Sequence, residues 1–371
     1  MMNIGMDRSQ LLPALAMVSG VVERRHTLPI LGNLLIAADN GGVTLRATDL
    51  ELEIGTRTGG RVQEGGATTV PARKLLDICR SLPEGAEVTI RTDGDRAAVV
   101  SGRSRFMLST LSADDFPSMD VGDAEVSLEL EQGVLRRLLE KTAFAMAQQD
   151  VRYYLNGVML ELSSEQVIAV ATDGHRLAKA TAALDAGAVK DLSETMQVIV
   201  PAKTVIELKR LLGQEAGTAS LELSARTLRL SMGHTVVTSK LVDGRYPEYD
   251  RVIPKGLERH AVVDREGLRA ALQRTAILSN EKYKGVRVAF EDGTLGLQSH
   301  NPEKEEAEDA LEIDYTGDAT TIGFNVGYIQ DVLGAVDEGA VEIWFRDGDS
   351  SAVWHGQGAE DETFVIMPMR L

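Results

Sequence analysis

The chain has 371 residues, of which 43% are hydrophobic, enough apolar side chains for two or three separate cores. Its net charge of −17 argues against a surface that binds nucleic acid everywhere. A single cysteine, Cys79, excludes an internal disulfide, and neither a signal-peptide core nor 18 uninterrupted apolar residues occur. We therefore expect a soluble, cytoplasmic protein.

Three glycine-centred motifs divide the chain into repeats. They are LGN at residues 31–33, NGV at 156–158 and KGV at 284–286, with their glycines 125 and 128 residues apart. Each follows a helix-like segment, and these segments end near Val22, Asp150 and Asn280. A second helix-like segment opens with VPA at 70–72, VPA at 200–202 and FNV at 324–326. This period is the size of a domain, so we predict three copies of one α+β domain at residues 1–125, 126–253 and 254–371.

Within each repeat, apolar residues follow two different periods. Residues 43–47, 158–162, 221–225 and 227–231 alternate with period two, as half-buried antiparallel strands do. Turn signals fall at residues 39–42, 93–94 and 292–293. The helical period places three sets on one face each: Leu135, Leu138, Leu139, Thr142 and Met146; Leu75, Cys79 and Leu82; Val205, Leu208 and Leu212. We expect two helices against antiparallel sheet in every domain.

Basic charge is concentrated in the predicted helices. The six segments at residues 8–25, 71–82, 131–152, 201–213, 264–284 and 324–338 carry +6 together, which leaves −23 on the rest. Arg73, Asp77 and Arg80 occupy positions i, i+4 and i+7 of one helix, and Lys203, Glu207 and Arg210 repeat this pattern. We expect these side chains to share a face that points away from the sheet. The third repeat has Gly327, Asp331 and Gly334 there. A solvated face with i,i+4 pairs is the alternative to a shared basic surface.

The sequence offers few candidates for catalytic chemistry. No nucleotide-binding loop, zinc motif or histidine pair with metal-ligand spacing occurs, so we expect no metal and no cofactor. Asp49, Glu51 and Glu53 alternate in a strand-like run, which favours one shared face. Because the equivalent stretches read DGHRL at 173–177 and NPEK at 301–304, solvated strand surface is the preferred interpretation. A three-domain hydrolase that uses acidic strand residues is the alternative.

Two segments are unusual for a scaffold. ATDGHRLA at residues 171–178 places Gly174 after an aspartate in an apolar strand context, for which a hairpin turn is the simplest interpretation. The end of the chain, residues 363–371, is apolar almost throughout, whereas chain ends are usually polar. We expect residues 364–366 to complete the third sheet. Met367 and Met369 lie beyond it and suit a surface that accepts several partners.

Six stretches carry a specific resemblance: TLPILGN at 27–33, SGRSRF at 101–106, QDVRYYLNG at 149–157, ATDGHRLA at 171–178, SKLVDGR at 239–245 and MPMRL at 367–371. Over essentially its whole length the chain resembles the bacterial DNA polymerase III beta subunits, the replicative sliding clamps. The resemblance implies a head-to-tail homodimeric ring of six domains, with helices around the hole and sheets outside. Twelve helices spaced about 8–10 Å apart enclose a hole of about 22–28 Å, wide enough for duplex DNA.

The resemblance also implies partners and roles. A clamp tethers the replicative polymerase alpha subunit to double-stranded DNA without reading its sequence, and is not an enzyme. The clamp loader, other polymerases and repair proteins would dock through short peptide motifs, with no membrane involved. A multi-domain scaffold that does not bind DNA is a third alternative.

Three sets of site residues follow from the resemblance and the shared helical register. The expected DNA-binding residues are Arg25, Arg73, Arg80, Gln149, Tyr153, Tyr154, Lys203 and Arg210. The expected partner-peptide groove comprises Leu155, Thr172, Gly174, His175, Arg176, Leu177, Pro247, Arg251, Val252, Asn325, Tyr328, Val365, Ile366, Met367, Pro368 and Met369. The expected dimer interface sets Lys74, Arg103, Arg105, Phe106 and Leu108 against Ile277, Leu278, Glu303, Glu305, Glu306 and Glu308. Tyr283 stands where the family often has phenylalanine.

Overall fold

The computed structural model describes residues 1–25, 28–120, 122–185, 187–190, 192, 194–213, 217–337 and 339–370. Thr27 and Leu371, the outermost residues of two resemblance motifs, lie outside the described residues, as does Glu338. The chain divides into two compact units. The first comprises Met1–Gly133, Gly187–Ser193 and Ile206–Leu241, and the second Val134–Ala186, Glu194–Val205 and Val242–Leu371. None of the described helices is long and apolar enough to cross a membrane.

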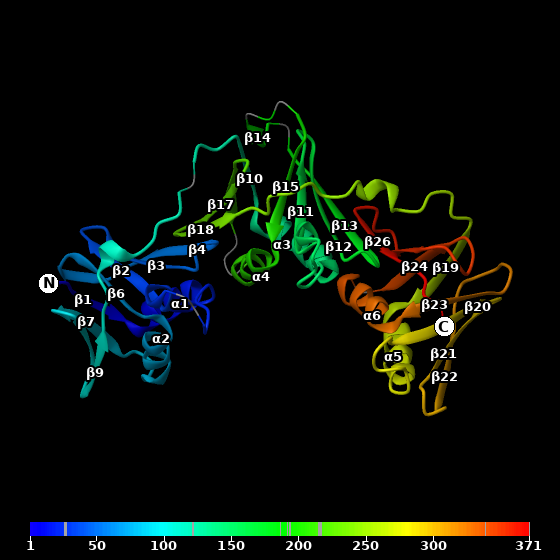
Figure 1. Ribbon diagram of the computed structural model, residues 1–371, viewed down its shortest axis with the longest axis horizontal. Coiled ribbons are helices and arrows are strands. Elements are labelled where there is room, and N and C mark those ends of the chain that lie inside the picture. The colour runs from blue at the N-terminus through cyan, green and yellow to red at the C-terminus, as the bar shows by residue number, and fades with distance from the viewer. Residues whose placement is uncertain are drawn as a thin grey trace. The chain divides into compact units, whose positions relative to one another are not determined.

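The first unit contains two antiparallel sheets. The five-stranded sheet has the order β5 (Arg61–Glu64), β1 (Asn3–Asp7), β7 (Glu87–Asp93), β8 (Arg96–Ser101), β9 (Ser104–Ser109). The nine-stranded sheet has the order β14 (Val189–Lys190), β10 (Val126–Glu131), β16 (Thr218–Leu223), β17 (Thr227–Met232), β18 (Thr235–Lys240), β4 (Leu52–Thr58), β3 (Gly42–Thr48), β2 (Asn33–Asp39), β6 (Gly66–Pro71). Helices α1 (Arg8–Ser19) and α2 (Ala72–Ser81) pack together against β2, β3, β4 and β6 (Figure 1).

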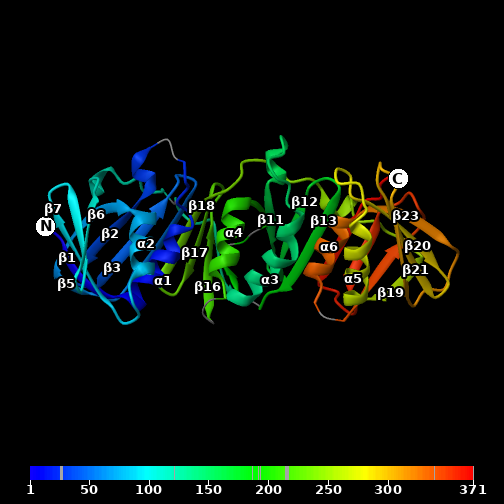
Figure 2. The same ribbon diagram turned by 90° about the horizontal axis from the view of Figure 1, so that it is seen from below.

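The second unit repeats this plan. Its eight-stranded sheet has the order β15 (Met196–Pro201), β11 (Gly157–Leu162), β12 (Gln166–Thr172), β13 (Arg176–Ala183), β26 (Glu362–Ile366), β25 (Ala352–Gly356), β24 (Ala340–Phe345), β19 (Arg259–Asp264). Its four-stranded sheet has the order β22 (Glu306–Glu312), β21 (Thr294–His300), β20 (Gly285–Glu291), β23 (Thr320–Asn325). Helices α5 (Arg265–Ala276) and α6 (Val326–Ala335) lie side by side (Figure 2). The boundary between the units falls within α3 (Gln132–Thr142) and α4 (Ala202–Leu211).

The sheets also show the threefold repeat. The triplets β2-β3-β4, β11-β12-β13 and β20-β21-β22 are equivalent, and so are β7-β8-β9, β16-β17-β18 and β24-β25-β26. The last strands of two such triplets pair twice within the chain: β18 with β4, and β26 with β13. The remaining last strands, β9 and β22, are edge strands of the described sheets.

The predicted α+β repeat with two helices per copy is confirmed, but several element boundaries were wrong. Three helices end earlier than expected: α1 at Ser19, α3 at Thr142 and α5 at Ala276. After α3 the chain enters a 3-10 turn, Ala143–Ala145, and Met146 is extended, so Met146 lies outside the helix face assigned to it. Residues 158–162 do not alternate in burial, because both faces of β11 are covered except at Glu161.

Three further expectations need correction. Glu207 is 8% exposed and pairs with Arg210, whose guanidinium donates to carbonyls of α1, so this part of the face packs against a neighbouring helix instead of pointing to solvent. Asp49 and Glu51 lie in the turn between β3 and β4, where Leu50 has φ 79°, and thus share no strand face with Glu53. Strand β26 does not belong to the third repeat alone, because it pairs with β13 on one side and β25 on the other. Pairing on both sides therefore accounts for the apolar residues 364–366.

Candidate functional site

A tight hairpin joins β12 to β13. Oδ1 of Asp173 accepts hydrogen bonds from the backbone N–H groups of His175 (2.9 Å) and Arg176 (3.1 Å). Gly174 has φ 89°, in the left-handed region that suits glycine. The Thr172 hydroxyl donates to the Arg176 carbonyl at 2.5 Å. The hairpin expected from ATDGHRLA is confirmed, and it presents His175 to solvent beside a fixed Arg176.

Arg176 is the most heavily engaged charged side chain of the hairpin. Its guanidinium donates to Asp173 Oδ2 (3.1 Å), to Asp331 of α6 and to the Phe144 carbonyl (2.6 Å). The guanidinium carbon lies 4.4 Å from the ring centroid of Tyr328. With 11% of its side chain exposed, Arg176 ties the hairpin to α6 and holds the Tyr328 ring in place. Burial raises the pKa of Tyr328.

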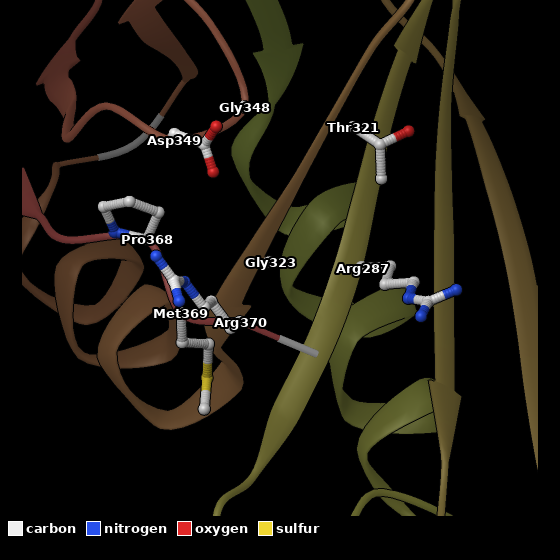
Figure 3. A pocket seen from close by; sticks show the side chains of 8 residues that line it. All are labelled: Arg287, Thr321, Gly323, Gly348, Asp349, Pro368, Met369 and Arg370. Atoms are coloured by element: carbon white, nitrogen blue, oxygen red, sulfur yellow. The ribbon is translucent and has the colours of Figure 1, made fainter.

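The apolar end of the chain is fixed to the same hairpin. After β26, the Met367 N–H donates to the His175 carbonyl (3.0 Å), and the Met369 N–H donates to the Gly323 carbonyl of β23 (2.8 Å). The Met367 side chain is exposed, whereas Pro368 and Met369 are half-buried. Beyond them is a depression of about 630 Å³ (Figure 3), whose lining includes Arg287, Asp349 and Arg370.

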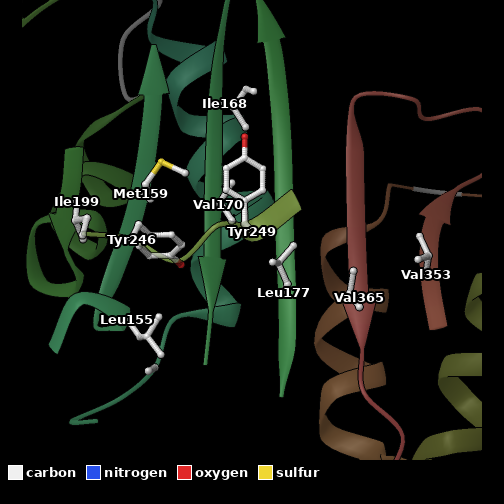
Figure 4. Packing of buried hydrophobic residues seen from close by; sticks show 11 residues of the cluster. Leu155, Met159, Ile168, Val170, Leu177, Ile199, Tyr246, Tyr249, Val353 and Val365 are labelled. Carbon is white, nitrogen blue, oxygen red and sulfur yellow. The ribbon is translucent and has the colours of Figure 1, made fainter. Parts of the chain in front are cut away.

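A buried apolar cluster supports this surface (Figure 4). Leu155, Leu177 and Val365 belong to it together with Tyr246 and Tyr249. These three residues and Ile366, all expected to line the partner groove, are almost inaccessible and belong to the core rather than to an exposed surface. Nearby in the chain, Pro247, Arg251 and Val252 are exposed, while Asn325 is half-buried and caps α6 through Oδ1. The sequence patterns did not identify Phe144, Asp173 and Asp331 as the partners of Arg176. The only signals were two aspartates: Asp173 in the ATDGHRLA stretch, and Asp331 between the two glycines of the third repeat's second helix.

The residues expected to bind DNA lie in both units. In the second unit, Tyr153 and Tyr154 form an edge-to-face pair with ring centroids 5.9 Å apart, and Tyr153 is exposed. Gln149 precedes them in a loop with φ 54°. The Arg152 side chain, by its hydrogen bonds, lowers the pKa of Asp150 to about 2. Lys203 is half-buried.

In the first unit, four arginines expected to bind DNA differ in their surroundings. Arg25 is exposed, and Arg73 donates to the Val22 carbonyl at 3.0 Å. Arg210 donates to the carbonyls of Ala16 and Met17 in α1, at 3.1 and 2.6 Å. Its guanidinium therefore serves the contact between α4 and α1. Arg80, the fourth, lies 3.8 Å from Asp77 and is exposed.

The expected interface residues lie on two strand edges and the neighbouring helices. Arg103 and Arg105 are exposed at β9, whose Phe106 and Leu108 line a depression of about 450 Å³ with Lys74 of α2. At the other surface, Glu306 and Glu308 are exposed on β22, and Glu303 and Glu305 on the loop before it. Ile277 is 76% exposed, and Leu278 is half-buried. One edge is therefore basic and the other acidic.

The described residues contain no group of three or more His, Cys, Asp or Glu side chains that could hold a metal ion. Glu53 faces Arg46 at 3.6 Å, and burial raises its pKa. Asp49 instead caps its own turn by accepting from the N–H groups of Glu51 and Leu52. The three acidic residues considered for hydrolysis thus have separate structural roles.

Three tandem α+β domains that share continuous antiparallel sheets define the class of the DNA clamps. Family models of the N-terminal, central and C-terminal domains of the DNA polymerase III beta subunit match residues 2–120, 129–248 and 250–370. The beta sliding clamps of Pseudomonas putida and Escherichia coli K12 are 48% and 45% identical to the chain, with 100% of both chains covered in each case.

Solved structures agree. The DNA polymerase III subunit beta from Pseudomonas aeruginosa matches with a TM-score of 0.94 and 46% identity, and the sliding clamp from Bartonella birtlesii, bound to griselimycin, with 0.95 and 39%. Each comparison covers 100% of both chains. The chain belongs to the DNA polymerase III beta subunit family.

Membership of this family settles the class of function. The chain is a sliding clamp that binds duplex DNA, tethers the replicative polymerase and docks partner proteins, and it is not an enzyme. The resemblance inferred from the six sequence stretches is confirmed, and the hydrolase alternative is wrong.

Proposed function

We propose that the clamp ring closes where strand β9 of one copy meets strand β22 of a second copy, head to tail. The two pairings within the chain, β18 with β4 and β26 with β13, support this proposal. In each, the last strand of one triplet joins the last strand of the other, and β9 and β22 are the equivalent strands left at an edge. Two such contacts per pair of chains close a ring of six domains.

Charge and apolar surface support the same pairing. Lys74 lines the depression beside β9, and Arg103 and Arg105 are exposed at the same strand, while the edge near β22 carries exposed glutamates. Exposed ion pairs contribute only about 0–1 kcal/mol each, so the apolar centre formed by Phe106, Leu108, Ile277 and Leu278 dominates affinity. The charges fix orientation and speed encounter.

Sedimentation tests this ring closure. Changing Ile277 and Leu278 together to alanine should give monomers in analytical ultracentrifugation. Val151→Ala, at another highly exposed apolar residue, should leave the dimer intact. A double variant that is still dimeric at nanomolar concentration would contradict the proposal. Dimers that are retained on circular DNA and lost from linear DNA would support a closed ring.

The DNA contacts follow from exposure and charge. Arg25, Arg73, Lys203, Gln149, Tyr153 and Tyr154 are proposed to meet the phosphate backbone, with Arg210 acting through its hold on α1. Neutralising Arg25, Arg73 and Lys203 should weaken DNA binding equally across sequences and flatten its dependence on salt. If the dependence of DNA affinity on salt concentration did not change, these residues would simply form a solvated helix face.

The partner groove is proposed to lie over the buried cluster that includes Leu177 and Val365, bordered by His175, Arg176, Tyr328 and Met367. Its occupant is a short peptide with leucine or phenylalanine anchors, supplied by the replicative polymerase, the clamp loader and repair proteins. The exposed Met367 side chain adapts to different peptides, because methionine has three rotatable bonds.

Domain boundaries at residues 1–125, 126–253 and 254–371 are also proposed, and the family-model matches begin and end within a few residues of them. We place the protein in the cytoplasm, where bacterial replication occurs and where its single cysteine stays reduced.

A further inference from the structure

At two places in the chain, the C-terminal turns of two helices meet and a cation joins them. Arg210, in the last turn of α4, donates to the carbonyls of Ala16 and Met17 in the last turn of α1. Lys141, in the last turn of α3, donates to the carbonyl of Ala335, the last residue of α6, at 2.6 Å. Helix C-termini carry partial negative charge, so two of them repel unless a cation satisfies their carbonyls.

A carboxylate holds each of these cations. Glu207 lies 2.6 Å from Arg210, and Glu362 lies 2.6 Å from Lys141. In each case one helix supplies a cation that a carboxylate holds, and the other helix supplies the carbonyls of its last turn. The contact between α4 and α1 accompanies the β18–β4 pairing, and the contact between α3 and α6 accompanies the β26–β13 pairing.

Helix α2 carries the acid–arginine pair of α4 at the same two positions. Both helices have ten residues and start directly after a proline. Asp77 and Arg80 are the sixth and ninth residues of α2, as Glu207 and Arg210 are of α4. The pair on α4 is docked, with 10% and 34% of the two side chains exposed, whereas the pair on α2 has 75% and 60% exposed. The α2 pair therefore has the same kinds of residue as the docked α4 pair but is exposed to solvent.

Helix α5 corresponds to α1 in the same way. Both have twelve residues and follow an aspartate. Gln273 and Arg274 hold the positions of Ala16 and Met17, so their carbonyls are the equivalent acceptors. The Arg274 side chain already binds Asp309 (2.7 Å). A cation that satisfies the last carbonyls of α5 must therefore come from another helix.

Two side chains are complementary in size: the acidic residue at the sixth position of α2 or α4, and the residue that directly follows α5 or α1. Gly20 follows α1, and a Cβ there would lie 2.2 Å from Glu207 Oε2 and 2.7 Å from an Arg210 nitrogen. Ile277 follows α5 at the equivalent place. The larger Ile277 would clash with a glutamate, but α2 has Asp77, which is one methylene shorter. Asp77 also lines the depression of about 450 Å³, with Ile78 and Ser81 beside it.

We propose that α2 of one copy docks onto the C-terminal end of α5 of a second copy, with Arg80 donating to the carbonyls of Gln273 and Arg274 and Ile277 lying beside Asp77. This inference rests on the ring closure proposed above and adds its helical half. It assigns Arg80 to the contact between copies. Arg80 shares its helical register with Arg73, and both were expected to bind DNA. In this proposal the two arginines have different roles.

Removing the guanidinium tests the proposal. Arg80→Ala should raise the dimer dissociation constant in analytical ultracentrifugation about tenfold or more, because hydrogen bonds from a charged donor are lost. Arg136→Ala is the matched control: it removes an exposed helical arginine that pairs with Glu140 at 2.8 Å, and should change the constant less than about twofold. An Arg80→Ala dimer as tight as the wild type would overturn the proposal.

A size swap tests the placement of Ile277. Asp77→Glu and Ile277→Gly should each weaken the dimer, and the double variant, which copies the Glu207–Gly20 combination, should lose less than the sum of the two single losses. Losses that simply add would overturn the proposed contact. A wild-type chain that stays monomeric would contradict the ring closure itself and this inference with it. A wild-type dimer insensitive to both tests would overturn only the helical contact.

Discussion

At the scale of single residues, charged side chains that the sequence assigns to a surface instead hold elements of the fold together. Arg176 satisfies two carboxylates and a carbonyl while its guanidinium packs on the Tyr328 ring. Arg210 holds the end of α1, and its partner Glu207 is buried. A helical wheel cannot reveal this, because a face that points away from its own sheet can still pack against a neighbouring helix.

Replacing Arg176 with methionine should destabilise the second unit by about 2–4 kcal/mol, because Asp173 and Asp331 lose their shared cation and the Phe144 carbonyl loses its donor. Chemical denaturation followed by circular dichroism measures the change. Arg245→Ala, at a side chain that is 88% exposed, should stay within about 0.5 kcal/mol of the wild type. A loss for Arg176→Met no larger than for this control would show that the hairpin holds without it.

Asp150 should titrate unusually low. Hydrogen bonds from Arg152 lower its pKa to about 2. A carboxyl with a folded-state pKa below its unfolded value stabilises the fold above about pH 4, and that contribution disappears as the pH falls toward 2. Carbon-13 NMR of the aspartate carboxyls should show this low titration, and Arg152→Ala should return it to near 4. An unchanged midpoint in Arg152→Ala would assign the shift to another cause.

At the scale of elements, links between helices and strands far apart in the sequence decide where elements meet. Lys141 of α3 has 5% of its side chain exposed, and Glu362 of β26 has 2%. Their ion pair of 2.6 Å joins the second repeat to the third beside the β26–β13 pairing. Gly157 fits at the start of β11 because a Cβ would lie 2.3 Å from the Val200 carbonyl oxygen. Close approach therefore explains this one repeat glycine.

Changing Lys141 to methionine should cost about 3–5 kcal/mol, because Glu362 would remain buried without its cation. Changing Glu362 to glutamine as well should restore part of the loss, which a double-mutant cycle in thermal or denaturant unfolding would measure. Arg136→Met, an exposed site on the same helix, is the control. A loss in the double variant equal to the sum of the two single losses would mean that the pair contributes no specific coupling.

At the scale of the whole molecule, we propose that two strand edges form the contact between copies and that the chain end borders the docking surface. Strands β9 and β22 are the ones that pairing within the chain leaves at an edge, and in the proposed ring each pairs with the other strand of a second copy. The chain end contacts the β12–β13 hairpin turn through Met367 and β23 through Met369, at a distance from both edges in sequence. Assembly and docking should therefore respond to different changes.

Deleting residues 367–371 should weaken binding of a fluorescent peptide with leucine and phenylalanine anchors by at least about thirtyfold, measured by anisotropy. The dimer and its retention on circular DNA should not change, because β26 and both edges remain. Met107→Ala, which removes an exposed methionine of β9, should leave peptide affinity unaltered. Wild-type affinity in the truncated protein would show that the chain end only terminates a strand.

The sequence by itself determined the repeat, the class of each domain and the family. Glycine spacing, the two hydrophobic periods and motifs such as ATDGHRLA are local features, and they depend on steric and burial rules that act within a few residues. The same rules placed the hairpin at Asp173 and the buried faces of Leu75, Cys79 and Leu82 correctly.

Tertiary structure decided the rest. It placed β26 between two repeats, buried Glu207 against α1 and gave Arg176 its three hydrogen-bonding partners. Each of these depends on groups far apart in the chain, as the 155 residues between Arg176 and Asp331 illustrate. No periodicity reports such contacts, because the free energy of a charged side chain depends on which carbonyls and carboxylates the folded neighbours bring to it.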